Sequence, residues 1–249
     1  MDRGKMSLSK IHFTNRILAA LPPDDLRLLL PYLKLVDLKQ KHVLYDIGQP
    51  IDALYFIEQG VASVLTTMEG GASIEVGMIG FEGMVPVSAM LGEKRAEQNM
   101  VMQLPGRAAK ISTEHCKAGF EQSPRIRKAI LYYTNSFLNL GAQTAACNRL
   151  HSIEQRLARW LLMSSDRFQS TTLPLTQEYI SNMLGVRRVG VTETAGELQR
   201  SALIRYNPGQ ITIIDREGLE KIACECYVND YERFQRNLNF NNLNLSGVR

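Results

Sequence analysis

The stretch from Leu175 to Ile214 constrains the fold more than any other part of this chain, because it contains the signals of a complete structural unit. Thr176 can cap the free N–H groups that open a helix. Ile180 and Leu184 stand four residues apart and form one apolar face. Gly185 is expected to end this helix, since glycine readily adopts the left-handed conformation that a sharp turn needs.

A second helix is expected from about Arg187 to Ser201. Its apolar side chains recur at helical spacing and would pack on the first helix: Val191, Ala195 and Leu198. A short hairpin follows, with strands at 203–206 and 210–214 joined by Asn207-Pro208-Gly209, a sequence that suits a tight turn. Together these elements predict a winged helix-turn-helix.

The outer face of the second helix is polar and carries Arg187, Arg188, Thr192, Glu193 and Arg200, and all of these except Arg200 lie toward its N-terminal end. In a helix-turn-helix, this end of the second helix meets base edges in the major groove of double-stranded DNA. Phosphate contacts are expected from Thr176, Gln177 and Arg205. Two other interpretations remain open, because glycine-linked helix pairs also occur in proteins that bind no DNA, and an arginine pair is often a solvated face.

The segment LTQEYISNMLGVRRVGVTETAGELQRSALI resembles the DNA-binding segment of the Crp/Fnr family of bacterial transcription regulators. The glycine-ended first helix, the arginine that opens the second and the aliphatic pattern through Leu198 carry the resemblance. It implies that Arg188 aligns with the family arginine that reads a guanine. Val189 stands where the family usually has glutamate, and Glu193 where it often has a base-contacting arginine. The family's target sequence is therefore not carried over, and Arg187 is a candidate substitute contact.

Composition limits the remaining possibilities. A chain of 249 residues favours two domains, and its net charge of +4 permits a polyanionic partner without requiring one. No apolar run approaches the roughly 18 residues of a membrane span. The opening residues lack the apolar core of a signal peptide. We therefore expect a cytoplasmic protein that does not enter a membrane.

The cysteine and histidine pattern does not predict a metal site. Four scattered cysteines are no disulfide framework, and the C-x-C pair Cys224 and Cys226 would point its thiols apart on the predicted helix. No cysteine precedes Cys116, whereas the iron–sulfur members of the family carry a cysteine cluster near the N-terminus. Four isolated histidines are expected to be surface or packed residues rather than haem ligands: His12, His42, His115 and His151.

The N-terminal part predicts short helices followed by a β-roll. After an arm at Met1–Lys10, residues 15–35 have a helical pattern that prolines break into pieces. Glycines then separate short apolar segments at 54–57, 61–65, 74–78 and 108–111, as in an antiparallel barrel or sandwich. The string LYDIGQPIDALYFIEQGVASVL resembles the first half of a cyclic-nucleotide-binding β-roll, so the family resemblance extends over about residues 15–220.

The effector segment departs from the nucleotide-binding pattern. A cyclic phosphate needs a guanidinium and backbone N–H groups, and the ribose hydroxyl needs a carboxylate. The nearest candidates are Glu82, Gly83 and Arg95, but they are out of register with the family's Gly-Glu and Arg-Ser or Arg-Thr pairs. We therefore expect no cyclic-nucleotide cofactor. Another small effector of unknown identity, or a roll that serves only as a packing scaffold, remains open.

A long helix is expected at about 123–148, with a heptad seam of Ile126, Ile130, Tyr133, Phe137, Leu140, Thr144 and Cys147. In the family this helix is the dimer interface. The seam is expected to pair with a second copy, with packing inside its own domain as the alternative, and Leu131 and Leu138 would face the roll. A further helix at 152–165, a polar linker at 168–172 and one helix from Arg216 to Leu238 complete the expected elements, before an Asn-rich disordered end at 237–249 to which no role is assigned.

These observations predict an α+β fold with a sensor part at 1–122, a dimerisation helix at 123–149, a DNA-binding part at 150–220 and a C-terminal helix and tail at 221–249. The predicted function is a homodimeric Crp/Fnr-type regulator on a two-fold-symmetric DNA site, with RNA polymerase as the further partner considered. A cyclic-nucleotide-responsive regulator and a sensor that acts on a protein without DNA are the alternatives. We expect no enzyme, since no nucleophile–base pair, metal triad or P-loop stands out.

Overall fold

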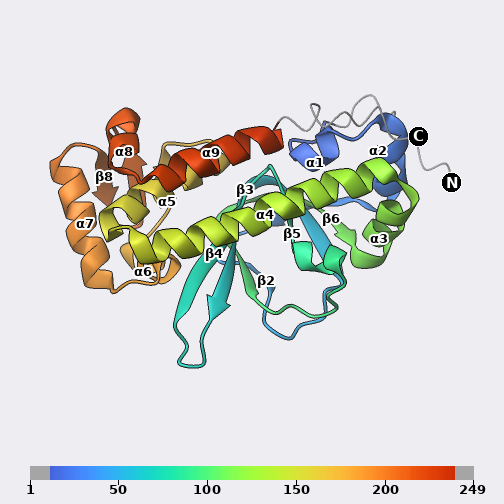
Figure 1. Cartoon of the computed structure of the whole chain (residues 1–249), viewed down its shortest axis with the longest axis horizontal. Helices are drawn as coiled ribbons and strands as arrows, with labels where there is room; N and C mark the ends of the chain where they lie inside the picture. The colour runs from blue at the N-terminus through green and yellow to red at the C-terminus, as the bar shows by residue number, and fades with distance from the viewer. Residues whose placement is uncertain (1–11, 239–249) are drawn as a thin grey trace.

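The computed structural model describes the backbone of residues 12–238 and the side chains as far as Arg236. The predicted N-terminal arm and nearly all of the predicted disordered end therefore lie outside the described residues. The described part is a mixed fold in which an antiparallel sheet packs beneath a long helix, with a second helical unit at one end (Figure 1). The predicted α+β class is confirmed.

Six strands form the roll, with order β1-β6-β3-β4 and with β2 on β6 and β5 on β3. They are β1(Lys34–Leu38), β2(Val43–Tyr45), β3(Ala53–Thr67), β4(Ser73–Ile79), β5(Met84–Val85) and β6(Asn99–Ser112). The predicted strands at 54–57 and 61–65 are one strand, because the chain continues through Gly60 at φ +90°. A Cβ on the facing Gly106 would lie 1.9 Å from the Gln59 carbonyl oxygen, so this close crossing of β3 and β6 needs glycine.

Short helices precede the roll: α1(Arg16–Ala19), α2(Pro23–Leu29) and a 3₁₀ turn at Leu30–Tyr32. The buried Asn15 caps α1 and donates to the carbonyls of Ile57 and Gly83, which fixes this segment to the roll. The helical prediction for 15–35 is correct as far as Tyr32. It is wrong for its last residues, which open β1 and pair with β6.

The long helix α4(Pro124–Leu150) follows α3(Thr113–Gln122) and runs over the roll as far as the second unit (Figure 1). The last helix, α9(Glu225–Leu238), packs on the C-terminal half of α4. The predicted seam residues of α4 lie on its inner face. Ile126, Ile130 and Tyr133 belong to the core of the roll, and Leu140 belongs to the core of the second unit.

The predicted dimer seam is therefore wrong as an intermolecular surface. Five of its seven residues are buried within a single chain, and the other two, Phe137 and Thr144, are half-buried. The expectation for Leu131 and Leu138 is also wrong, because these side chains are 43% and 60% exposed instead of facing the roll. A heptad stripe indicates that a helix face is buried, but it does not indicate whether the same chain or a second copy buries it.

The second unit contains α5(Ile153–Phe168), β7(Thr172–Leu173), α6(Gln177–Leu184), α7(Arg188–Arg200), β8(Ile204–Asn207), β9(Gln210–Ile213) and α8(Arg216–Ile222). The predicted helix-turn-helix and hairpin are present. The hairpin gains β7 as a third strand on β9, at the end of what was expected to be only a linker. One continuous apolar core joins this unit to the roll, since Val61, Met78 and Leu104 pack with its helices.

The C-terminal helix is not continuous, contrary to expectation. The chain is extended at Ala223, with ψ 147°, so α8 ends there and α9 starts two residues later. Cys224 lies in this break, and Cys226 lies in the first turn of α9. The reasoning that a helical C-x-C pair separates its thiols therefore does not apply.

Candidate nucleic-acid interface and effector region

The turn between α6 and α7 is held by local caps that the sequence predicts. The Thr176 hydroxyl accepts a hydrogen bond from the Tyr179 N–H, and Gly185 takes the left-handed conformation with φ +62°. The Arg156 guanidinium, buried on α5, donates to the carbonyl of Leu184 and so satisfies an end group of α6. These contacts fix the direction in which α7 leaves the turn.

One face of α7 is buried through Val191, Thr194, Ala195 and Leu198, and the opposite face is open. All residues predicted to meet base edges are exposed: Arg187, Arg188, Val189, Thr192 and Glu193. Figure 1 shows α7 at the outer edge of the molecule, away from the roll. Arg187 is the N-cap of α7 and forms no side-chain cap, so the first N–H groups of the helix remain available to an anion.

The predicted phosphate contacts are divided between α6 and the wing. The Thr192 hydroxyl donates 2.8 Å to the Gln177 Oε1, so these two side chains lie together across the two helices. Arg205 is exposed on β8, the first strand of the hairpin. The structure thus presents all eight residues on one unit, while their contacts with DNA stay predictions.

The three residues predicted for an effector pocket do not form one. The Glu82 carboxylate accepts a hydrogen bond of 2.8 Å from the buried guanidinium of Arg167 on α5. A Cβ on Gly83 would lie 2.1 Å from the ring of Tyr133, so α4 packs directly on this loop. Arg95 donates to the Gly48 carbonyl at an exposed site. Glu82 and Arg95 are therefore not brought together around a ligand.

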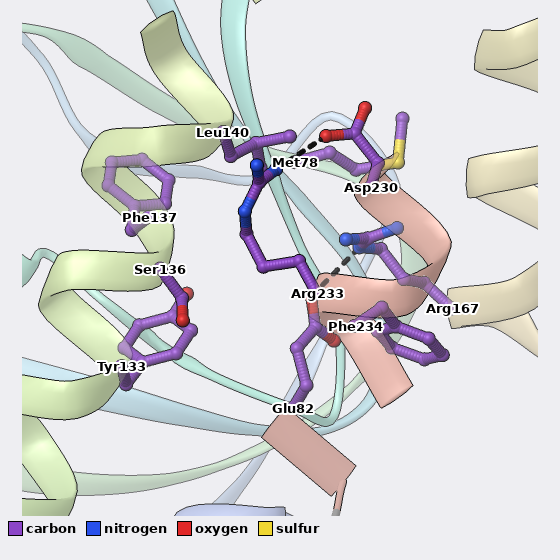
Figure 2. Close-up of a pocket in the computed structure, with 10 residues that line it drawn as sticks. All are labelled: Met78, Glu82, Tyr133, Ser136, Phe137, Leu140, Arg167, Asp230, Arg233 and Phe234. Atoms are coloured by element: carbon purple, nitrogen blue, oxygen red, sulfur yellow. Dashed lines mark hydrogen bonds and ion pairs between the residues drawn. The ribbon is translucent and has the colours of Figure 1, made fainter. Parts of the chain in front are cut away.

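Helix α9 covers what space remains between the roll and α4. Figure 2 shows Arg233 of α9 on the side of that helix that faces Tyr133 and Phe137 of α4, with the Arg167–Glu82 pair beside it. The cavity among them is about 20 Å³, enough for about one water molecule. Small-molecule sites typically occupy about 300–1,000 Å³. A cyclic nucleotide does not fit there without movement of α9.

A buried polar chain connects the roll with α5. The Glu75 carboxyl on β4 lies 2.5 Å from the Ser63 hydroxyl and 3.1 Å from the indole N–H of Trp160, which donates to it. Burial raises the pKa of Glu75 to about 7. Ser63 also lies 2.8 Å from the amide oxygen of Gln103, and its one proton cannot serve both neighbours. A protonated Glu75 supplies the missing donor.

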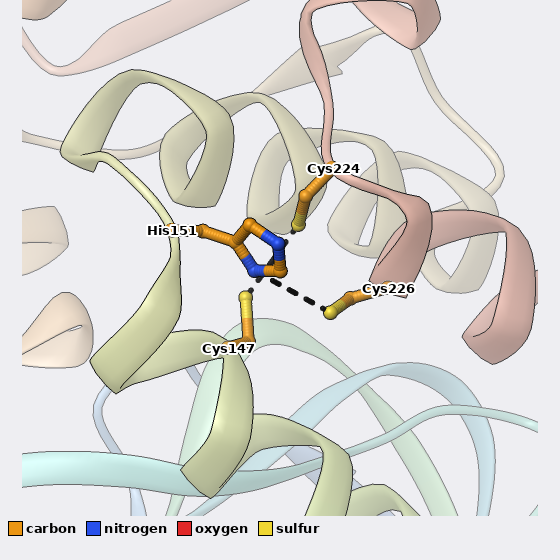
Figure 3. Close-up of side chains that lie close together, drawn as sticks. All are labelled: Cys147, His151, Cys224 and Cys226. Atoms are coloured by element: carbon orange, nitrogen blue, oxygen red, sulfur yellow. Dashed lines mark hydrogen bonds between the residues drawn. The ribbon is translucent and has the colours of Figure 1, made fainter.

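The cysteine and histidine side chains that looked isolated in the sequence meet in space. Cys147, His151, Cys224 and Cys226 lie together where α4 ends and α9 begins (Figure 3). The expectation of no such cluster is therefore wrong. Cys147 in the last turn of α4 and His151 just past its end are four residues apart, which was a usable signal, but nothing in the sequence placed the C-x-C pair beside them.

Sequence comparison identifies the domain type of the second unit. Residues 155–222 match the Crp-like helix-turn-helix domain. The transcriptional regulatory protein btr of Bordetella pertussis is 25% identical over 205 residues, covering 75% of this chain and 80% of that protein. The CRP-like cAMP-activated global transcriptional regulator of Mycobacterium tuberculosis is 22% identical, covering 83% of this chain and 96% of that protein.

Solved structures share the fold over most of the chain. A Crp/Fnr-family transcriptional regulator from Eubacterium rectale has a TM-score of 0.65 at 19% identity, covering 81% of this chain and 94% of its own. The c-di-GMP-responsive global regulator CLP of Xanthomonas campestris has a TM-score of 0.64 at 17% identity, covering 77% and 98%. Among residues 12–238, no helix is long and apolar enough to cross a membrane. The chain therefore carries a Crp-like helix-turn-helix domain and is similar over most of its length to Crp/Fnr-type transcription regulators.

Proposed function

We propose that this protein is a cytoplasmic homodimer that binds a two-fold-symmetric DNA site and regulates transcription there, rather than an enzyme. The observation that carries the proposal is the open polar face of α7, presented by a domain of the Crp-like helix-turn-helix type. Residues 1–122 would be the regulatory part, 123–149 the dimer helix and 150–220 the DNA-binding part. RNA polymerase would be a further partner.

Dimerisation is proposed along the outer face of α4, in place of the buried seam. The exposed residues of this face again follow a heptad spacing: Leu131, Asn135, Leu138, Ala142, Ala145 and Arg149. Two exposed leucines followed by two alanines would let a second helix approach closely. A polar residue such as Asn135 within the stripe favours a single register.

Two copies joined in this way would carry their α7 helices to successive major grooves, about 34 Å apart. Arg188 and Arg187 would read bases, with Val189, Thr192 and Glu193 beside them. Thr176, Gln177 and Arg205 would contact phosphates and fix the orientation of the domain. The changes at Val189 and Glu193 relative to the family imply a different preferred sequence.

The M. tuberculosis relative is named as cAMP-activated and the X. campestris structure as c-di-GMP-responsive. For this chain we propose that neither ligand acts at the space between the roll and α4, because Tyr133 and α9 fill it. If a small effector exists, its identity is open.

Selection of bound oligonucleotides from a random duplex pool tests the proposal directly. The expected result is a palindromic consensus whose half-sites are one helical turn apart, which reports both base reading and the dimer. A pool that stays random, together with a shallow salt dependence of binding, would instead favour a sensor that acts on a protein partner.

A further inference from the structure

Three cysteines and one histidine, far apart in the sequence, meet beside the end of α4 (Figure 3). Cys147 lies in the last turn of α4 and His151 directly after it, while Cys224 and Cys226 flank the start of α9. Each side chain offers one ligand atom, and the four atoms all lie within 4.8 Å of one another. The three cysteines are buried and the histidine is half-buried, so the cluster is enclosed by protein.

The spacing of these atoms suits a single metal ion. The Sγ atoms of Cys147 and Cys224 are 3.6 Å apart, and so are the Cys226 Sγ and the His151 Nδ1. A tetrahedral Zn²⁺, with bonds of about 2.3 Å to sulfur and about 2.0 Å to nitrogen, separates its ligand atoms by roughly 3.5–3.8 Å. A disulfide would bring two sulfurs to about 2.0 Å, whereas all four cysteines of the chain are free.

The surroundings of the cluster orient its members as metal ligands are usually oriented. The His151 Nε2 lies 3.2 Å from the Glu225 carboxylate, which leaves the Nδ1 lone pair directed at the thiols. A metal-bound histidine normally donates its other ring N–H to such a carboxylate. The amide of Gln143 donates to the Cys226 sulfur at 2.9 Å.

We propose that Cys147, His151, Cys224 and Cys226 hold one Zn²⁺ ion in a tetrahedral site. Three thiolates and an imidazole form a donor set of structural zinc sites, and four protein ligands leave no open coordination position for a substrate. Zinc binding would release the protons of those thiols that are still protonated. The site is therefore a structural cross-link rather than a catalytic centre.

The proposed ion would join the two segments that flank the DNA-binding domain in the sequence. Cys147 and His151 precede the matched Crp-like domain at 155–222, and Cys224 and Cys226 follow it. The ion would thus fasten α9 to α4 next to the buried Arg159–Asp230 ion pair. Because α9 also covers the space beside Glu82, zinc would hold this cover in place.

The test measures the metal content of the full-length protein, purified under reducing conditions, incubated with Zn²⁺ and desalted. We expect one zinc per chain for the wild type and for Cys116→Ser, a matched control because Cys116 is buried in α3 outside the cluster. Cys224→Ser and Cys226→Ser should lose the zinc while their circular dichroism spectra stay folded. A zinc chelator should lower the melting temperature of the wild type by more than about 5 °C.

Substitution of Co²⁺ for zinc gives a readout that needs no variant. A tetrahedral thiolate site should show sulfur-to-cobalt charge-transfer bands and intense visible bands in the wild-type protein. This measurement decides the matter if the serine variants fail to fold. Zinc far below one ion per chain, zinc retained by both variants, absent cobalt bands, iron with acid-labile sulfide, or a Cys147–Cys224 disulfide in place of metal would each overturn the proposal.

Discussion

Arg167 on α5 donates a hydrogen bond of 2.8 Å to Glu82 in the roll, and the two side chains are only 5% and 3% exposed. The Arg167 guanidinium also lies over the ring of Phe234 on α9, at 4.9 Å from its centroid. This ion pair and the Phe234 ring therefore join the roll, the first helix of the second unit and the last helix. Its position gives the three parts one fixed arrangement.

Replacing Glu82 by alanine should destabilise the protein by about 3 kcal/mol, because it leaves a buried guanidinium without its carboxylate. Urea denaturation of Glu82→Ala and of the double variant Glu82→Leu/Arg167→Met measures this effect. The double variant removes both charges and should recover much of the lost stability. If both variants were equally unstable, the loss would reflect packing rather than an unpaired charge.

Glu75 should make the stability fall as the pH rises. Its pKa is raised from 4.5 to about 7 in the folded protein. The folded state therefore binds this proton more tightly than the unfolded state does. The contribution is fully present below about pH 4.5 and is lost as the pH rises through about 7, a change of about 3 kcal/mol. Urea denaturation at several pH values should show this slope in the wild type and a flatter one in Glu75→Gln. Parallel curves would contradict the assignment.

Cyclic AMP and cyclic GMP should leave the melting temperature unchanged, since α9 and Tyr133 occupy the space beside Glu82. A ligand at 100 times its Kd stabilises the folded state by about 2.7 kcal/mol, or roughly 5–10 °C here. Differential scanning fluorimetry detects such a shift. A clear rise with either nucleotide would show that the region opens and binds.

Leu138→Glu should weaken the dimer, because it places like charges near the symmetry axis of the proposed outer seam of α4. Analytical ultracentrifugation should show a Kd raised at least about tenfold, or about 1.4 kcal/mol. Leu91→Glu is the matched control, since Leu91 on the roll is 57% exposed against 60% for Leu138. Equal behaviour of the two variants would move the interface elsewhere.

Arg188→Ala and Arg205→Ala should weaken DNA binding in different ways. The first should weaken binding to the selected site by about 1–3 kcal/mol and leave binding to random duplex unchanged. The second should weaken binding to all duplexes alike and reduce the salt slope by about 1. Arg200→Ala, at the far end of α7, serves as the control. Gel-shift titrations at several salt concentrations separate these outcomes, and an unchanged Arg188→Ala would remove that residue from the reading face.

The sequence alone determined the elements whose signals are local. Thr176 and Gly185 mark the two ends of α6 through their capping chemistry. The spacing of the apolar residues in α7 determines which of its faces is buried. Tertiary structure decided what lies against each covered face. The most apolar stripe of α4 packs inside its own chain, and the pocket candidate Glu82 is paired with Arg167, 85 residues further on. In the tertiary structure α8 also ends at Ala223, which places Cys224 and Cys226 beside Cys147 and His151. Capping and periodicity act within a few residues, whereas a salt bridge, a filled cavity or a ligand cluster depends on which distant segments the whole fold brings together.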